Sequence, residues 1–339
     1  MVRVLVAAIV AMMASIVVAP TFIEYLRRNE MGQHIREEGP QGHVTKQGTP
    51  TMGGLLILLC AMFPFLALSH YTLASLTVAF IAVGCGLIGF LDDFIKFRHR
   101  RSLGLSGRWK LLLLALITLG TGLLAHHMHY PTWVYIPALG HLPLGPGWYL
   151  LLFFIIAGSA NGVNLTDGLD GLASGTGIIS LFTFMAMSVI AFIRSSPSPG
   201  LRSTSRLDLA LLAAALIGGL IGFLWYNAFP AEIFMGDTGS MAIGGALAGF
   251  AIMTKTEFLL LLIGGIYLIE ALSVMIQVFT FKYLGRRVFL MAPIHHHFEM
   301  KAWSETKIMV RFWILGGIFC ASAFALFYRF FVDFSFKIR

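Results

Sequence analysis

Long apolar runs alternate with short polar segments along almost the whole chain. A helix needs roughly 20 apolar residues to cross about 30 Å of hydrocarbon, and most of these runs approach that length. The pattern predicts ten membrane-spanning helices, over residues 4–19, 52–69, 73–91, 111–126, 148–160, 172–193, 207–225, 240–254, 258–280 and 312–331. The fifth and eighth runs are short, so neighbouring protein or a thinned bilayer must cover their ends.

The composition supports a membrane protein and excludes a soluble globular one. Hydrophobic residues make up 58% of the chain and charged residues 12%, against about 25% charged residues in soluble domains. Cys60, Cys85 and Cys320 each stand alone in an apolar run, which indicates neither a disulfide framework nor a zinc site. We therefore predict a single all-α integral membrane domain over residues 1–339.

The distribution of lysine and arginine predicts the orientation of these helices. The loops after the first, third, fifth, seventh and ninth runs hold 16 of these residues, and the opposite side holds 8. Because positive charge gathers on the cytoplasmic side, the odd-numbered loops are expected in the cytoplasm and both termini outside. Arg27 and Arg28 outnumber Arg3, which favours a retained first span over a cleaved signal peptide.

Two segments on the external side have distinctive sequences. Residues 130–144 contain no lysine or arginine and alternate in polarity, which predicts an external loop with a small hairpin. Residues 195–205 are rich in serine, proline and glycine, which is typical of a linker.

Each odd-numbered loop carries a polar cluster that a simple connection between helices does not need. The five clusters are KQGTPTMGG (46–54), DDFIK (92–96) with its extension to Lys110, NGVNLTDGLDG (161–171), FMGDTGS (234–240) and MAPIHHHFE (291–299). All five fall on the face assigned to the cytoplasm, whereas the sites of transporters lie near the middle of the membrane. The clusters therefore favour an enzyme over a transporter or a structural membrane protein.

Three of the clusters are rich in glycine and precede helices that run inward from this face. The free N–H groups and the positive dipole end of a helix N-terminus suit phosphate, and glycine lets the phosphate come close. The alternative is that GTPTMGG, DGLDGL and GDTGS are helix caps and turns. The occurrence of all three at one face favours a phosphate site.

The clusters also contain five aspartates beside the predicted phosphate site: Asp92, Asp93, Asp167, Asp170 and Asp237. Carboxylates repel phosphate unless a divalent ion lies between them, and Mg²⁺ is the natural bridge. Asp93 and Asp170 are equally well explained as helix caps. Since Asp92 and Asp93 point about 100° apart on a helix, we do not expect both to serve one ion in the same way.

Other polar residues of the clusters have candidate roles. Lys46, Lys96 and Lys110 adjoin the carboxylates and suit an anionic substrate or lipid headgroup, whereas the nearby arginines fit the positive-inside pattern. Three consecutive histidines (295–297) cannot easily point at one metal ion, which favours hydrogen bonds to a diphosphate. Glu270, near the middle of the ninth span, is expected to be a protonated structural residue that does not face lipid.

In their order and their spread from residue 46 to 299, these clusters closely resemble those of one family. This family is the phospho-N-acetylmuramoyl-pentapeptide transferases, also called translocase I or MraY, within the polyprenyl-phosphate hexose-1-phosphate transferase superfamily. The DD motif and the NLTDGLDG-like segment are shared across the superfamily, whereas MAPIHHHFE is similar to the muramoyl-pentapeptide branch. The longer segment WYNAFPAEIFMGDTGS (225–240) also matches.

The resemblance implies roles for individual residues. Asp237 would coordinate Mg²⁺, with Asp92 as a second candidate ligand, and both Asp92 and Asp93 would lie at the phosphates. The implied catalytic residues are Asp92, Asp93, Asp237, Lys46, Lys96, Lys110 and His296. The residues implied to hold the uridine are Asn164, Asp167, Gly168 and Phe234. Those implied to line the rest of the substrate cleft are Thr51, Asp170, Asn227, Ser240, Gln277, His295 and His297.

The resemblance also implies a reaction and a setting. Phospho-MurNAc-pentapeptide would pass from UDP-MurNAc-pentapeptide to undecaprenyl phosphate with Mg²⁺ as cofactor, giving lipid I and UMP in peptidoglycan synthesis. The enzyme would be a homodimer with ten spans in the bacterial inner membrane and a cytoplasmic active site, and no nucleic-acid partner is expected. The alternatives are transfer of GlcNAc-1-phosphate from UDP-GlcNAc, against which the histidine segment argues, and transport of a lipid phosphate.

Overall fold

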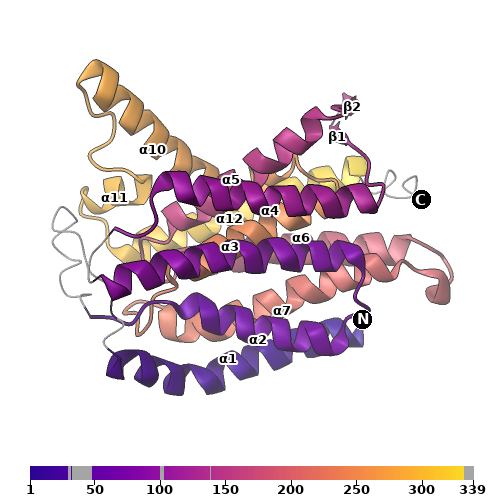
Figure 1. The fold of residues 1–339 in the computed structure, drawn as a ribbon, viewed down its shortest axis with the longest axis horizontal. Helices are drawn as coiled ribbons and strands as arrows, with labels where there is room; N and C mark the ends of the chain where they lie inside the picture. The colour runs from indigo at the N-terminus through magenta and orange to yellow at the C-terminus, as the bar shows by residue number, and fades with distance from the viewer. Residues whose placement is uncertain (30–31, 33–47, 100–102, 138, 332–339) are drawn as a thin grey trace.

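The computed structural model describes residues 1–29, 32, 48–99, 103–137 and 139–331, which are mostly helical. Within these residues, ten long helices follow the ten predicted runs in order (Figure 1): α1 (Val2–Arg28), α2 (Gly53–Leu68), α3 (Leu73–Arg98), α4 (Gly107–His127), α5 (Gly147–Thr166), α6 (Leu172–Arg194), α7 (Thr204–Asn227), α8 (Gly236–Met253), α10 (Gly265–Leu284) and α12 (Glu305–Leu326). The short elements are β1 (Trp133–Ile136), β2 (Gly140–Pro143), η2 (Pro199–Leu201), α9 (Leu260–Ile263), α11 (Ile294–Glu299) and η3 (Phe327–Phe331). The prediction of an all-α integral membrane protein is confirmed.

Eight of the long helices in the described part of the chain have the length and apolar composition of a membrane span. The other two are α2, with 16 residues, and α8, with 18. Every residue of α8 from Thr238 to Met253 is buried, because α3, α5 and α2 pack around this helix. A helix enclosed by protein needs no lipid-facing apolar surface, which explains why its apolar run is short.

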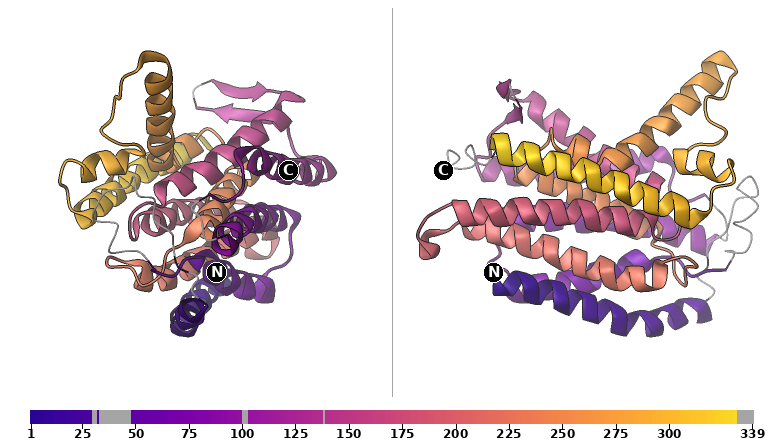
Figure 2. Two further views of the ribbon diagram at one scale, coloured as in Figure 1. Left: turned by 60° about the vertical axis from the view of Figure 1, so that its left-hand side comes forward. Right: turned by 180° about the vertical axis from the view of Figure 1, so that it is seen from behind.

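Several helices extend past the predicted spans, as α1 does to Arg28 and α3 to Arg98, and two further differences have a clear local cause. The run 148–160 underestimates α5, because the polar residues that follow it continue the helix, and the Asn161 amide donates to the carbonyl oxygen of Ala157 at 2.8 Å. The run 258–280 overestimates one span, because the chain breaks at Gly264 into the short α9 and the longer α10. Beyond this break α10 projects away from the other helices (Figures 1 and 2).

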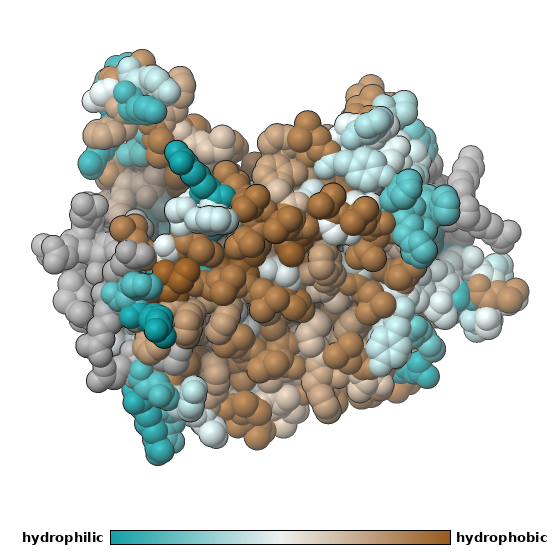
Figure 3. All heavy atoms as spheres, viewed as in Figure 1, coloured by the Kyte–Doolittle hydropathy of each residue, from teal (hydrophilic) through white to brown (hydrophobic). Residues whose placement is uncertain are grey.

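The polar clusters gather at one end of the helical bundle. The described parts of the loops after α1, α3, α5, α7 and α10 lie at this end, on the left of Figure 1. The start of α1 and the β1–β2 hairpin lie at the other end, and an apolar band separates the two ends (Figure 3). The hairpin predicted within residues 130–144 is confirmed, with β1 antiparallel to β2 and Trp133 opposite Pro143.

Candidate active site

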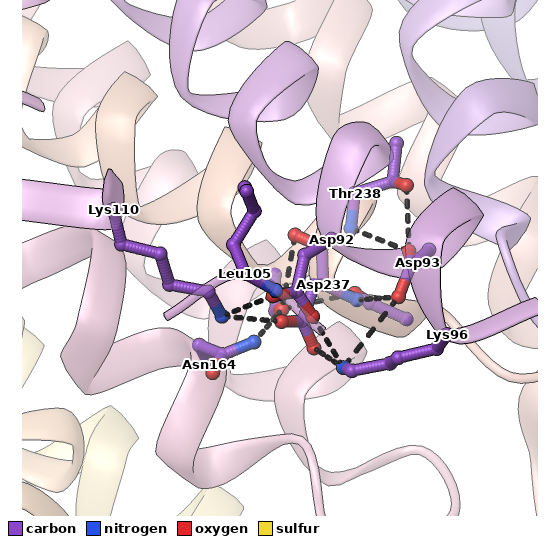
Figure 4. A network of polar contacts seen from close by, with 10 residues as sticks. Asp92, Asp93, Lys96, Leu105, Lys110, Asn164, Asp237 and Thr238 are labelled. Atoms are coloured by element: carbon purple, nitrogen blue, oxygen red, sulfur yellow. Dashed lines mark hydrogen bonds and ion pairs between the residues drawn. The ribbon is translucent and has the colours of Figure 1, made fainter. Parts of the chain in front are cut away.

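An acidic cluster forms where the end of α3 meets the start of α8 (Figure 4). Gly89 permits this contact, since a Cβ atom added there would lie 2.1 Å from the backbone oxygen of Asp237. Any larger residue would force the two backbones apart. Asp92 and Asp93 follow Gly89 after about one helical turn, so the close packing brings both of them to Asp237.

Asp93 caps the N-terminus of α8 from the neighbouring helix. Its Oδ1 accepts the N–H of Asp237 at 3.1 Å, and its Oδ2 accepts the N–H and the hydroxyl of Thr238 at 2.9 and 2.7 Å. The side chain of Asp93 is buried. Its contacts are therefore those of a cap, which was the structural alternative for this residue, although the helix that it caps is not its own.

Asp92 and Asp237 share two ammonium groups. The Nζ of Lys96 lies 2.6 Å from an oxygen of Asp92 and 3.1 Å from one of Asp237. The Nζ of Lys110 lies 3.1 Å from the other oxygen of Asp92 and 2.9 Å from the other oxygen of Asp237. The N–H of Leu105 also donates to Asp92, at 2.7 Å, and ties the loop between α3 and α4 to the cluster. These residues come from α3, α4 and α8, and Figure 4 shows them converging.

The donor set of this cluster suits Mg²⁺. Asp92, Asp93 and Asp237 place carboxylate oxygens within 4.8 Å of one another, close to the separation of about 4.2 Å that opposite ligands of one Mg²⁺ have. Three carboxylates face two ammonium groups, so the cluster carries one excess negative formal charge. A divalent cation would reverse that excess and make the cluster attractive to a diphosphate.

The three glycine-rich helix N-termini lie at this end as predicted, but their first N–H groups have protein partners. The two glycines that begin α2 donate to the carbonyl oxygens of Phe234 and Met235, each at 2.9 Å. The start of α8 is capped by Asp93, and Gly171, which precedes α6, donates to the side chain of Asn227 at 3.2 Å. These N–H groups hold the loops together, which favours the alternative of caps and turns, and contact of these N-termini with phosphate stays a prediction.

Three of the residues implied to contact the substrate lie between α5 and α8. The amide of Asn164 donates to the hydroxyl of Ser240 at 3.0 Å. Asp167, just after α5, is partly buried. Burial first, and then the negative charges of Asp237 and Asp93, raises the pKa of Asp167 to about 8, although a backbone N–H at the start of α8 opposes the shift.

Asp167→Asn is expected to change how stability depends on pH. The pKa of Asp167 rises from an ordinary 3.8 to about 8 in the folded protein, so between these values the folded state keeps a proton that the unfolded state releases. The wild type should therefore lose stability as pH rises through this window, and the Asn variant should lose less. Thermal unfolding in detergent with EDTA measures the melting temperature of each protein. The melting temperature of the variant minus that of the wild type should increase by about 2 °C or more from pH 5 to pH 8. A constant difference would contradict the raised pKa.

His295 and Glu270 form a buried pair in which Nδ1 lies 3.1 Å from Oε1. The prediction that Glu270 is buried is confirmed, but its pairing with a histidine of the MAPIHHHFE segment was not predicted. The Nε2 of His295 would lie 2.3 Å from a Cβ atom added at Gly168. Glycine at position 168 therefore lets His295 reach the segment that follows α5.

The other histidines and Gln277 organise the loop between α10 and α11. The side-chain amide of Gln277 bonds to the backbone of residues 288–289, accepting at 3.1 and 3.0 Å and donating at 2.9 Å. The Nδ1 of His297 accepts a backbone N–H of the same loop at 3.1 Å, and His296 pairs with Glu299. These contacts shape one wall of the polar end, while contact of these residues with substrate stays a prediction.

Asn227 and Asp170 are buried and hold neighbouring loops together. Asn227 accepts the hydroxyl of Ser174 at 2.7 Å and donates to the carbonyl oxygen of Ile233 at 2.9 Å. Asp170 accepts the N–H of Ala231 at 3.0 Å. These bonds indicate structural roles, and the substrate contacts implied for both residues stay predictions.

Thr51 and Phe234 lie on two loops that are joined at the same end. The N–H of Phe234 donates to the carbonyl oxygen of Pro50 at 2.8 Å. Both Thr51 and Phe234 keep part of their surface exposed, so a ligand at this end can reach them. Lys46 lies outside the described residues, and its role stays a prediction.

Gly89→Ala is expected to lower both the melting temperature and the rate of the reaction at this site, the rate by about tenfold or more. The added methyl group meets the backbone oxygen of Asp237 and must push α3 from α8, which separates the carboxylates. Gly158→Ala is a matched control, because a Cβ atom there has no neighbour within 4 Å. Equal activity of the two variants would contradict the proposed backbone contact.

Two family models match this chain. The model of glycosyl transferase family 4 matches residues 74–255, and phospho-N-acetylmuramoyl-pentapeptide-transferase signature 1 matches residues 46–58. Relatives named phospho-N-acetylmuramoyl-pentapeptide-transferase from Frankia alni and Rubrobacter xylanophilus are each 46% identical, over 97% of this chain and 98% of their own. A relative of the same name from Bacillus velezensis is 42% identical, over 91% of this chain and 93% of its own.

Proposed function

Because this chain belongs to the phospho-N-acetylmuramoyl-pentapeptide transferase family, we propose that it transfers phospho-MurNAc-pentapeptide from UDP-MurNAc-pentapeptide to undecaprenyl phosphate. The products are lipid I and UMP, in the first membrane step of peptidoglycan synthesis. The signature over residues 46–58 and the names of the relatives favour this reaction over transfer of GlcNAc-1-phosphate. The position of the acidic cluster at one end of the bundle favours an enzyme over a lipid-phosphate transporter.

The ion pairs that Asp92 and Asp237 share with Lys96 and Lys110 are the observation that carries this proposal. Phosphoryl transfer requires mainly that the reactants are positioned and that negative charge is stabilised. Carboxylates that suit a divalent ion and ammonium groups that suit phosphate lie here within ion-pair distance. The cluster also lies at the end of the helices, where a lipid phosphate and a water-soluble nucleotide can meet.

In the proposed reaction, an oxygen of the lipid phosphate attacks the phosphorus that carries the sugar. The bond from this phosphorus to the bridging oxygen breaks, and UMP leaves with that oxygen. The ammonium groups of Lys96 and Lys110 stabilise the charge on the phosphate oxygens, and Asp93 holds the start of α8 so that Asp237 stays in place. Mg²⁺, held by Asp237 and Asp92, would neutralise charge on the diphosphate when bound.

We also propose that the protein is a homodimer in the bacterial inner membrane, with the polar end facing the cytoplasm. The excess of lysine and arginine in the odd-numbered loops supports this orientation. The family resemblance supports the dimer. Chemical cross-linking in native membranes tests the dimer, and labelling of single introduced cysteines from each side tests the orientation.

The proposed reaction is tested with purified protein, Mg²⁺, undecaprenyl phosphate and either UDP-MurNAc-pentapeptide or UDP-GlcNAc. We expect release of UMP from the first nucleotide alone, and loss of release when EDTA removes the metal. Release from UDP-GlcNAc alone would overturn the assignment to the muramoyl branch. Full activity in EDTA would overturn the role of Mg²⁺.

Phe234→Ala is expected to weaken binding of the uridine nucleotide by about 5- to 150-fold, since stacking on a base is worth about 1 to 3 kcal/mol. Calorimetric titration with UMP measures this change. Phe229, exposed by 48% in the same loop, provides the control Phe229→Ala, which should bind normally. Unchanged affinity in Phe234→Ala would place the uracil elsewhere.

A further inference from the structure

A cavity of about 430 Å³ lies at the end of the bundle opposite the acidic cluster. Its walls come from the ends of α6 and α8, the start of α7, and the linker over residues 195–205. The proposed function gives no role to this serine-rich linker. The cavity is larger than a phosphate ion and falls within the range of about 300 to 1,000 Å³ that is typical of ligand sites.

One side of the cavity is lined by hydroxyl groups. The serines in its wall are Ser188, Ser195, Ser196, Ser203 and Ser205. Ser188 is only 1% exposed, and its hydroxyl has no hydrogen-bond partner. Because a buried hydroxyl without a partner is unfavourable, Ser188 indicates that a polar ligand completes this wall.

Arg206 supplies the cation of the cavity. One of its N–H groups donates to the carbonyl oxygen of Ala191 at 2.9 Å, and both residues line the wall. Lys255 lines the cavity as well, but its ammonium group is held by two backbone carbonyl oxygens, at 2.5 and 3.1 Å, and by Glu257 at 3.5 Å. The guanidinium group of Arg206 has five N–H donors, so it can keep its protein contacts and still donate to an anion.

The surroundings of the cavity carry excess positive charge. The described lysines and arginines at this end are Arg3, Arg194, Arg202, Arg206, Lys255 and Arg329, against the acidic residues Asp208 and Glu257. Arginine is normally depleted from external loops, so three arginines around one short linker run against the general trend. Their presence indicates an anionic partner on this side of the membrane.

The remaining lining of the cavity is apolar and includes Met187, Leu209 and Phe327. A free inorganic anion would gain nothing from these side chains. A molecule with a phosphate group at one end and hydrocarbon at the other would satisfy both sides of the cavity. A bilayer presents such molecules at the depth of the helix ends.

We propose that this cavity binds the phosphate headgroup of an anionic phospholipid of the outer leaflet. The guanidinium group of Arg206 suits phosphate, because its forked N–H donors match two phosphate oxygens. The hydroxyl of Ser188 and its neighbours donate to the other oxygens, and the first carbons of the acyl chains contact the apolar lining. The site is separate from the transfer reaction, and only its assignment to the outer leaflet rests on the orientation proposed above.

Native mass spectrometry of the full chain from mixed micelles tests this site, with phosphatidylglycerol and phosphatidylcholine as probes. We expect the wild type to retain phosphatidylglycerol in preference to phosphatidylcholine. Arg206→Gln should weaken this retention by about tenfold or more, because a charge-assisted hydrogen bond is lost. Arg202→Gln removes an equal charge from the adjoining linker, but Arg202 does not line the cavity, and this variant should leave retention unchanged.

Ala191→Leu provides a second variant, because it narrows the cavity without a change of charge and should also weaken retention. The melting temperature and UMP release of each variant establish that it is folded. Equal retention of the two lipids, or equal retention by Arg206→Gln and Arg202→Gln, would overturn the proposal. Soluble glycerol phosphate that binds as tightly as the lipid would overturn the contact with the acyl chains.

Discussion

Asp237→Asn is expected to leave a folded protein with at most about one hundredth of the wild-type rate of UMP release. The two oxygens of Asp237 pair with Lys96 and Lys110, and the same carboxylate is the proposed ligand of Mg²⁺. The amide has no charge to hold the ion, and it offers N–H groups where the lysines require acceptors. Initial rates at saturating Mg²⁺ measure the loss.

The fold of this variant should survive, because Asp93 caps the start of α8 through backbone N–H groups that the substitution leaves unchanged. Glu232→Gln is the matched control, since it removes one exposed negative charge from the same end of the bundle, outside the cluster. The control should retain nearly full activity and a normal melting temperature. Activity of Asp237→Asn within about tenfold of wild type would exclude a central role for this carboxylate.

The positions of the helices could largely be predicted from the sequence, because a membrane span leaves a long apolar run. Because successive loops lie on opposite sides of the membrane, the five polar clusters of the odd-numbered loops were predicted at one end. The described parts of these loops lie at one end in the structure. The end of α5 and the break at Gly264 could not be predicted from hydropathy, for a physical reason. Burial within the protein relaxes the need for apolar residues, and a glycine in an apolar run does not lower hydropathy enough to end a predicted span.

The residues of the site could be predicted from the sequence, but the residues with which they pair could not. Asp92, Asp237, Lys96 and Lys110 were candidates from their motifs, and the structure brings them together. The pairing of Glu270 with a histidine depends on how α10 packs against α11, which sequence spacing does not encode. The protein partners of the glycine-rich N-termini were not predicted for the same reason, since the acceptors of their N–H groups come from distant segments.

Asp92 has two possible roles, which its contacts help to separate. It lies at the end of α3 beside the proposed phosphate site, where a carboxylate can be imagined to deprotonate the lipid phosphate before attack. Its oxygens, however, are already engaged by Lys96, Lys110 and the N–H of Leu105. Accepting a proton would require Asp92 to release one of these partners, so the geometry favours a role in holding the lysines and the metal ion.

Asp92→Asn is therefore expected to remain at about one hundredth of wild-type activity or below from pH 6 to pH 9, because no pH restores the missing charge. A phosphate monoester has a second pKa of about 6, so the lipid nucleophile is already mostly dianionic at pH 7 and needs little help from a base. If Asp92 acted only as that base, solvent would replace it as pH rises, and the variant would recover. Initial rates of UMP release across this range, with melting temperatures recorded at each pH, distinguish the two roles. Recovery of most wild-type activity at pH 9 in folded protein would establish Asp92 as the general base and refute the positioning role.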